Sequence, residues 1–201
     1  MTGESVTTLY DFQLSMLHAM STRVPSPGAD LLERIGATRT ETRMAEIRWW
    51  GSDATNKFSS IGEYVTAWGA PDSDRVERHG DREIRYAGRD LPFWPGLRIE
   101  WMELSHHPTL FRQLLRHPDC PRPKMESIAD LTPWSCTGNE IHDGTLGPTH
   151  MIDGWGGPGD IAVFRAIDPD SGHNRVYRAH FDWCLLQFVE PAPDTYEWWT
   201  R

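Results

Sequence analysis

The densest group of residues able to bind a metal ion or move a proton lies in residues 138–160. This stretch holds His142, His150 and Asp153 among further aspartates, on a backbone rich in glycine and proline. Three interpretations are open: a turn-rich loop whose aspartates cap their own backbone, a loop at the rim of a catalytic pocket, and a metal site formed by the three named residues. Their spacing matches neither the HxH nor the HExxH pattern of metal sites.

A second group lies on the last predicted strand, where side chains alternate between two faces. One face carries the apolar Tyr177, Ala179, Phe181 and Trp183, and the other carries Arg178, His180 and Asp182. A base, an acid and a cation on one sheet face suit acid–base catalysis if that face lines a cavity, because a buried carboxylate must be paired or functional. An outer face in water would show the same pattern. In the catalytic interpretation His180 or His150 moves the proton, and Asp182 or Asp153 orients the imidazole.

Tryptophan is abundant, with 10 in the chain, and most of these side chains are expected in a core. Trp94 and Trp155 lie in loops rich in proline and glycine, where an indole often frames an apolar ligand or a partner surface. We therefore predict a substrate pocket lined by Trp94, Trp101, Trp155 and Arg178. The sequence contains no nucleophile elbow, phosphate-binding loop or dinucleotide fingerprint, and we expect no cofactor.

The elements that would position these groups follow from the spacing of apolar residues. Helices are predicted over residues 5–23, 29–37, 60–71 and 107–118, and strands over residues 45–51, 82–88, 96–104, 160–168 and 175–189. The last two strands, joined by a polar turn, are expected to form an antiparallel hairpin. The order predicts an α+β fold, with a curved antiparallel sheet packed against N-terminal helices.

The whole chain, at 201 residues, is expected to form one domain over residues 1–201, with a helical and loop insertion over residues 105–149. A net charge of −9 argues against nucleic-acid binding, because phosphate contacts require clustered Lys and Arg. The same acidic balance suits a protein that covers a basic partner. With no membrane-spanning run, no secretory pattern and three cysteines without CxxC spacing, we expect a cytoplasmic protein without a membrane partner.

Two segments, about a third of the chain, resemble the SnoaL-like proteins of the nuclear-transport-factor-2-like superfamily. Residues 46–68, "EIRWWGSDATNKFSSIGEYVTAW", resemble that family's strand ending in Trp-x-Gly and leading to a helix, and residues 175–183, "RVYRAHFDW", resemble its closing strand. The resemblance implies a cone-shaped α+β barrel, often dimeric, with a pocket between helices and sheet. The family's acid/base aspartate would fall on Asp182, with His180 beside it. The segment 105–149 and the C-terminal tail depart from the family pattern.

Three functional hypotheses follow. The first is a cofactor-independent acid/base enzyme, a cyclase, hydratase/dehydratase or isomerase, acting on a small apolar molecule, with a homodimer as the assembly that the resemblance implies. The second is an acidic, non-catalytic interaction protein of the inhibitor or immunity type, which binds a basic partner. The third is a metal-dependent enzyme that uses His142, His150 and Asp153.

Overall fold

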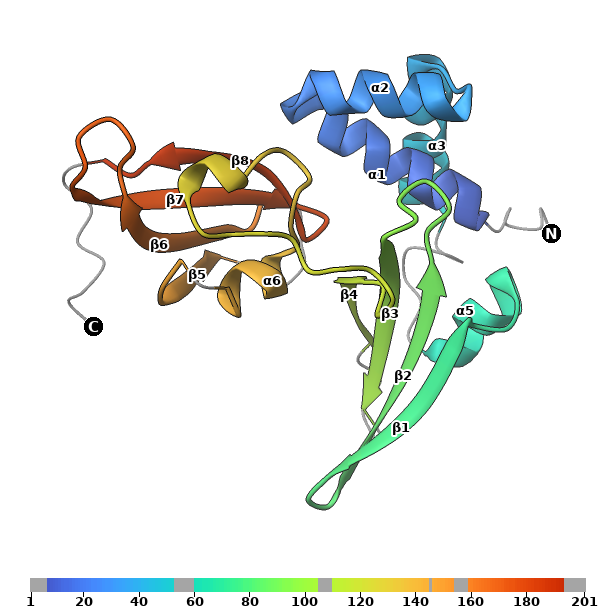
Figure 1. The fold of residues 1–201 in the computed structure, drawn as a ribbon. Helices are drawn as coiled ribbons and strands as arrows, with labels where there is room; N and C mark the ends of the chain where they lie inside the picture. The colour runs from blue at the N-terminus through green and yellow to red at the C-terminus, as the bar shows by residue number, and fades with distance from the viewer. Residues whose placement is uncertain (1–6, 53–59, 105–109, 145, 154–158, 194–201) are drawn as a thin grey trace. The chain divides into compact units, whose positions relative to one another are not determined.

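The computed structural model describes residues 7–52, 60–104, 110–144, 146–153 and 159–193. The chain divides into two compact units, Met1–Cys120 and Pro121–Arg201. Among the described residues, each unit contains short helices and one four-stranded antiparallel sheet, called sheet A in the first unit and sheet B in the second (Figure 1). No helix in the described ranges has the length and apolar character needed to cross a membrane.

The first unit begins with helices and ends with strands. In chain order it contains α1 (Leu9–Arg23), α2 (Pro25–Ile35), α3 (Arg39–Gly51), α5 (Ile61–Trp68), β1 (Ser73–His79), β2 (Arg82–Asp90), β3 (Leu97–Leu104) and β4 (Leu110–Arg116). The strands pair in the order β1-β2-β3-β4, and α1 packs against both α2 and α3.

Local sequence signals fix the ends of these helices. The Thr8 side chain accepts a hydrogen bond from the Asp11 amide at 3.1 Å and so caps α1. Pro25 begins α2, a position where its missing N–H costs nothing. Thr38 and Glu41 form a reciprocal capping box at the start of α3.

Two predicted elements of the first unit are wrong in type. Residues 45–51 form the end of α3 rather than a strand, because Ala45 and Trp49, four residues apart, are both fully buried on one helix face. Residues 107–118 were expected to form a helix, but 110–116 form β4, whose Leu114 pairs with Ile99 of β3. An apolar run this short fits either structure, and pairing with β3 decides the outcome. Residues 46–51, whose sequence resembles the end of a strand in SnoaL-like proteins, therefore form part of a helix in this chain.

The core of the first unit is aromatic. Phe12 packs on Trp49 with ring centroids 4.8 Å apart, and Tyr64 packs on Trp101 at 4.2 Å. Trp68 contacts both groups. Since Trp101 projects from β3, this cluster covers one face of sheet A and leaves the opposite face to other side chains.

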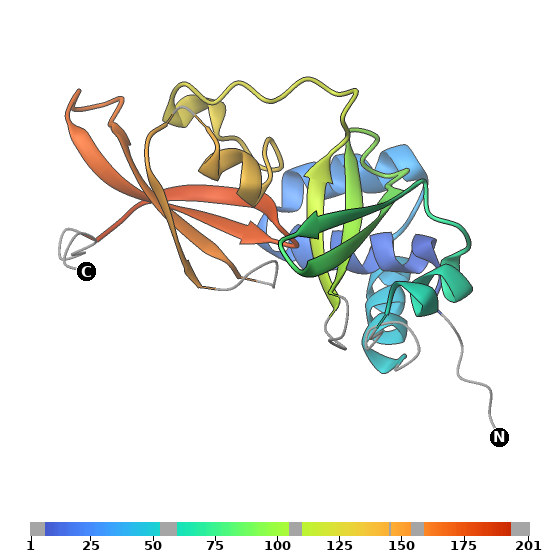
Figure 2. The same cartoon turned by 90° about the horizontal axis from the view of Figure 1, so that it is seen from below.

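The second unit has the same order of short helices followed by strands. It contains the 3-10 helix η1 (Ile128–Asp130), α6 (Gly138–His142), β5 (Thr149–Asp153), β6 (Ile161–Ile167), β7 (Asn174–Asp182) and β8 (Leu185–Pro191). Its strands pair in the order β5-β6-β7-β8 (Figure 2). One face of sheet B packs on the apolar residues of the loop, η1 and α6 that precede it: Met125, Leu131, Cys136 and Ile141.

The predicted hairpin is confirmed, with Ala162 of β6 opposite Ala179 of β7. Its turn is organised by Asp168, whose carboxylate accepts hydrogen bonds from the Ser171 amide at 2.8 Å and from the Tyr177 hydroxyl at 2.8 Å. Gly172, at φ 70°, supplies the left-handed backbone that the turn requires.

The predicted strand over residues 175–189 is wrong in one respect, because a tight turn divides it into β7 and β8. Trp183 and Cys184 form this turn with φ values of 52° and 61°. Left-handed backbone is unfavourable for both residue types, so neither residue signals a turn in the sequence. The preceding loop holds the turn in place: the Gly138 amide donates to the Cys184 carbonyl at 2.9 Å.

The α+β class, with helices ahead of antiparallel strands, is confirmed. The described strands form two open four-stranded sheets in place of one cone-shaped sheet. The segment 105–149 supplies β4 to sheet A as well as η1 and α6 to the second unit. The prediction of one domain over residues 1–201, with this segment as an insertion, stays a prediction.

Candidate functional site

The face of sheet B opposite its apolar core carries a cluster of charged side chains. Arg178 of β7 lies directly across from Glu190 of β8 and donates a hydrogen bond to its carboxylate. His180, two residues along β7, places Nε2 3.0 Å from the same Glu190 oxygen. The predicted alternation therefore holds for Arg178 and His180, which lie opposite the core residues Tyr177, Ala179 and Phe181 of the same strand.

His180 is held tightly in this cluster. Its side chain is 14% exposed, and its ring stacks on Phe188 with centroids 4.3 Å apart. Burial raises the pKa of Glu190, but the hydrogen bond from His180 and the charge of Arg178 outweigh burial and leave this pKa below its ordinary value. Glu190 is therefore ionised at neutral pH, and His180 and Arg178 share it.

Sequence reasoning missed Glu190, because the cluster depends on the register between β7 and β8. The sequence predicts one uninterrupted strand through residue 189, and residues of a single strand do not pair with one another across a turn. Asp182, predicted to orient His180, lies beyond a β-bulge between His180 and Phe181 and is only 3% exposed. Among the described residues, the carboxylate within hydrogen-bond distance of the His180 imidazole is that of Glu190.

The residues predicted around the 138–160 stretch occupy separate elements. His142, at the end of α6, places Nδ1 2.9 Å from the Thr149 hydroxyl. His150 is exposed on β5. Asp153 ends β5, but its side chain and the whole of Trp155 lie outside the described residues. Among the side chains that the structure describes, no three His, Cys, Asp or Glu residues meet as a metal site would require. The metal hypothesis stays a prediction.

Two of the predicted pocket tryptophans lie in the first unit. Trp94 is 8% exposed and packs beside Phe93, with ring centroids 6.0 Å apart. Trp101 is 2% exposed and, together with Tyr64 and Trp68, lines a hollow between α5 and sheet A that has about 10 Å³ of water-accessible space. A space of this size holds about one water molecule and is far smaller than a small-molecule pocket.

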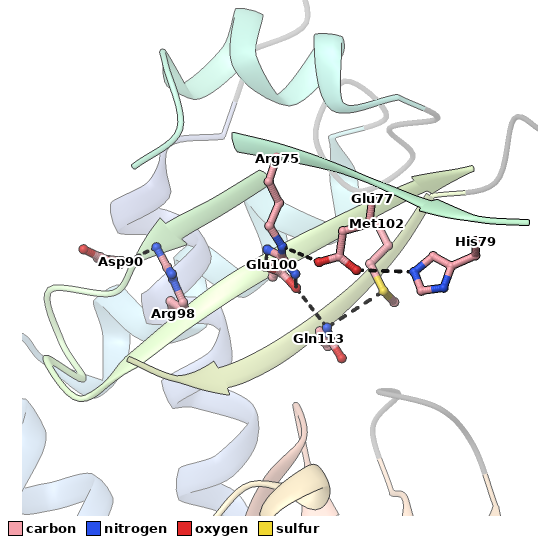
Figure 3. A network of polar contacts seen from close by, with 8 residues as sticks. All are labelled: Arg75, Glu77, His79, Asp90, Arg98, Glu100, Met102 and Gln113. Carbon is pink, nitrogen blue, oxygen red and sulfur yellow. Dashed lines mark hydrogen bonds and ion pairs between the residues drawn. The ribbon is translucent and has the colours of Figure 1, made fainter. Parts of the chain in front are cut away.

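A larger polar network occupies the face of sheet A opposite the aromatic core (Figure 3). At its centre is Glu100 of β3, which is 2% exposed. Arg75 Nη1 and Nη2 each donate a hydrogen bond to the Glu100 carboxylate, and the Nη2 bond is 3.3 Å long. The Gln113 side-chain amide donates a third hydrogen bond to this carboxylate at 3.1 Å. Strands β1 and β4 thus each contribute one donor side chain to the buried carboxylate of β3.

Arg75, whose side chain is 44% exposed, is held by three neighbouring side chains. Its Nε donates to Glu77 at 2.8 Å, and its guanidinium lies 4.1 Å from the centre of the Tyr86 ring. The hydrogen bond with Glu100 raises the pKa of Arg75. The hydrogen bond from Arg75 lowers the pKa of Glu77. Arg75 and Glu77 are therefore both charged at neutral pH, and His79 extends the network with Nε2 3.3 Å from Glu77.

A glycine makes room for the second arginine of this face. Gly88 of β2 is buried, and a Cβ built there would lie 2.5 Å from the Ser73 hydroxyl and 3.2 Å from Arg98 Nε. Arg98 is 13% exposed and lies 3.5 Å from Asp90. A side chain at residue 88 would displace Arg98 from this position.

Apolar side chains flank the network. Met102 follows Glu100 by two residues on the same face and is partly buried, and Phe111, opposite Met102 on β4, is 45% exposed. We name this surface the polar face of sheet A. It consists of Ser73, Arg75, Glu77, Tyr86, Gly88, Arg98, Glu100, Met102, Phe111 and Gln113. Sequence reasoning missed it because neither β1 nor the strand at 110–116 was predicted.

Comparison with known proteins assigns no family. No protein-family model matches the chain, and no curated protein matches it. Among solved structures, a candidate beta-lactamase inhibitor protein from Streptococcus mutans is similar over 66% of this chain and 82% of that chain, at 12% sequence identity and a TM-score of 0.27. What stands of the sequence resemblance is the α+β class.

Proposed function

We propose that this chain is a non-catalytic interaction protein that binds a basic protein partner through the polar face of sheet A. The observation that carries the proposal is the half-exposed Arg75, paired with the buried Glu100 beside the half-exposed Phe111, on the sheet face that the aromatic core does not cover.

The energetics of such a pair favour recognition over stability. Removing the Glu100 carboxylate from water is expensive, and apolar residues in place of a buried charge often stabilise a fold as well or better. Arg75 is instead held rigid by two carboxylates and a tyrosine ring. A rigid arginine loses little entropy on binding, and arginine and tyrosine are enriched among the residues that dominate interface energies.

The charge of the chain favours a basic partner. The polar face and its edge contain three carboxylates, Glu77, Asp90 and Glu100, against the guanidiniums of Arg75 and Arg98. The first unit, which contains sheet A, has seventeen acidic and fourteen basic side chains, so it carries a net negative charge. A negative surface steers a positive partner and speeds its association.

A selection from a random peptide library displayed on phage tests this proposal with the purified chain as target. We expect the selected peptides to be rich in Lys and Arg and to contain at least one large apolar residue. Phe111→Ala should lower the affinity of the chain for the selected peptides by about tenfold, because truncating a side chain that anchors an interface has an effect of this size. Val76→Ala is the matched control, because Val76 is 60% exposed on the other face of β1. Peptides without positive charge, or equal binding by both variants, would refute the proposal.

The second candidate is the acid/base enzyme acting on a small apolar molecule, which the His180–Glu190 pair favours. An imidazole 3.0 Å from an ionised carboxylate and shielded by Phe188 is an arrangement suited to proton transfer. Glu190 would stabilise the charged imidazole, and Asp182 or His150 would contribute only through a substrate.

Turnover of enones and β-hydroxyacyl compounds, the substrates of hydration and dehydration, tests the enzyme candidate. A chain that turns over any of them should lose about 10²–10⁴-fold in rate on His180→Ala. Absence of turnover in the wild-type chain, or turnover equal in His180→Ala, counts against it. Metal analysis of the purified protein tests the metal-dependent version: a stoichiometric metal that His142→Ala removes would support it.

A further inference from the structure

Helix α3 exposes an apolar ridge on the side that faces away from α1. Met44, Ile47 and Trp50 recur at three-residue steps, and their exposed fractions are 45%, 53% and 52%. The opposite side of the helix is buried through Ala45 and Trp49, both 0% exposed. Single exposed apolar residues are common on protein surfaces and need no explanation. Here three large apolar side chains, each about half exposed, lie together on one short helix, and such a patch marks a candidate contact surface.

Two arginines flank the ridge. Arg39 and Arg43 lie four residues apart, and Arg43 lies four residues before Ile47, so both arginines are on the ridge side of the helix. Both are exposed, and neither forms an ion pair with another described residue. The carboxylates of α3 are engaged elsewhere: Glu41 caps the helix, and Glu46 lies 3.2 Å from His18 of α1.

The pattern is symmetric about Ile47, with an apolar side chain three residues before it and another three residues after it. Two copies of α3 packed antiparallel, with Ile47 against Ile47, therefore place Met44 of each copy beside Trp50 of the other. The same register brings Arg43 of each copy to Gly51 of the other, where the helix ends. Cations are favoured at the carbonyl end of a helix, so the arginines meet a complementary charge.

We propose that a second copy of this chain covers the α3 ridge, forming a two-fold symmetric dimer with Ile47 at its axis. The contact is self-complementary, as two-fold interfaces require. It is also small, because three side chains per copy form its apolar part. An interface below the standard size is weak, and we expect a dissociation constant between about 1 µM and about 1 mM. The proposal does not depend on the partner of sheet A.

Sedimentation velocity over the same concentration range, from about 1 µM to about 1 mM, tests the dimer. The wild-type chain should show a rising mean mass. Ile47→Lys and Ile47→Asp should each weaken self-association by at least about tenfold, because like charges then meet at the axis. Ile167→Lys is the matched control, since Ile167 is 59% exposed on β6 and should leave the dimer unchanged.

Mixing the two variants separates the proposed dimer from other contacts of α3. With Ile47 against Ile47, an equimolar mixture of Ile47→Lys and Ile47→Asp pairs opposite charges and regains dimerisation. A wild-type chain that stays monomeric, an Ile47→Lys chain that still dimerises, or a mixture that fails to recover would each overturn the proposal. The last result would point instead to an acidic surface elsewhere as the ridge's partner. Thermal unfolding checks that the Ile47 variants are folded. Met44→Ala is a milder change on the same ridge, and it should also weaken the dimer.

Discussion

Buried and half-buried carboxylates in this chain each accept hydrogen bonds from several donors. Glu100 accepts from Arg75 and Gln113, Glu190 from Arg178 and His180, and Asp168 from backbone amides and a tyrosine. A buried charged group left without partners costs its full desolvation penalty, which explains why Glu100 and Asp168 each have several donors. Each carboxylate is therefore a place where one substitution has an effect out of proportion to the atoms removed.

Replacing Arg75 tests the network of sheet A. Arg75→Leu should lower the free energy of unfolding by about 2 kcal/mol, since Glu100 remains buried with Gln113 as its remaining described donor. The double variant Arg75→Leu/Glu100→Leu should regain most of that loss, because no charge is then buried. Urea unfolding of the three proteins measures both effects. A double variant less stable than Arg75→Leu would contradict this view of the network.

The Asp168–Tyr177 pair predicts a loss of stability at alkaline pH. Burial, assisted by the hydrogen bond to Asp168, raises the pKa of Tyr177 to about 12. A group whose pKa is raised by folding stabilises the protein below its unfolded pKa of about 10, and this stabilisation is lost as pH rises toward the folded value. The free energy of unfolding should therefore fall between pH 10 and pH 12.

Tyr177→Phe should remove part of that fall, because phenylalanine does not ionise. Tyr64 is also buried, and burial raises its pKa, so a smaller alkaline loss should remain in the variant. Urea unfolding at a series of pH values makes the comparison. An unchanged slope in Tyr177→Phe would show that other groups cause the loss.

At the scale of elements, signals within a few residues were predictable and pairing between distant residues was not. The spacing of Ile61, Tyr64 and Trp68 predicted α5, and the polar turn at 168–174 predicted the β6–β7 hairpin. Residues 45–51 and 110–116 carry short apolar runs that fit helix or strand, and packing on α1 or pairing with β3 decides between them. Both candidate sites depend on such pairing, which explains why Glu100 and Glu190 were not among the predicted site residues.

The β7–β8 turn predicts a stabilising substitution. Cys184 has φ 61°, and left-handed backbone costs a residue with a Cβ roughly 1–2 kcal/mol. Cys184→Gly should therefore raise the free energy of unfolding by about 1 kcal/mol, after the loss of the side chain's own contacts. Cys120→Gly, at a residue without positive φ, should not stabilise the protein. A lower midpoint of urea unfolding for Cys184→Gly would show that its side-chain contacts outweigh the strain.

At the scale of the whole molecule, each of the two units has its own helices, sheet and buried core. Each sheet packs apolar side chains on one face and holds a charged cluster on the other, at Arg75–Glu100 in the first unit and Arg178–Glu190 in the second. The net charge of −9 is consistent with the proposed basic partner. Acidic composition was readable from the sequence, whereas the surface that would use it required the fold.

Nuclear magnetic resonance titration with a selected basic peptide is the most direct test of the central claim. The side-chain N–H groups of Arg75 and Gln113 lie on the polar face of sheet A, and those of Arg178 lie on sheet B, so their resonances report on the two surfaces separately. The account predicts that the Arg75 and Gln113 signals shift and saturate together as peptide is added. Signals of Arg75 and Gln113 that stay in place while the peptide binds, with Arg178 shifting instead, would contradict it.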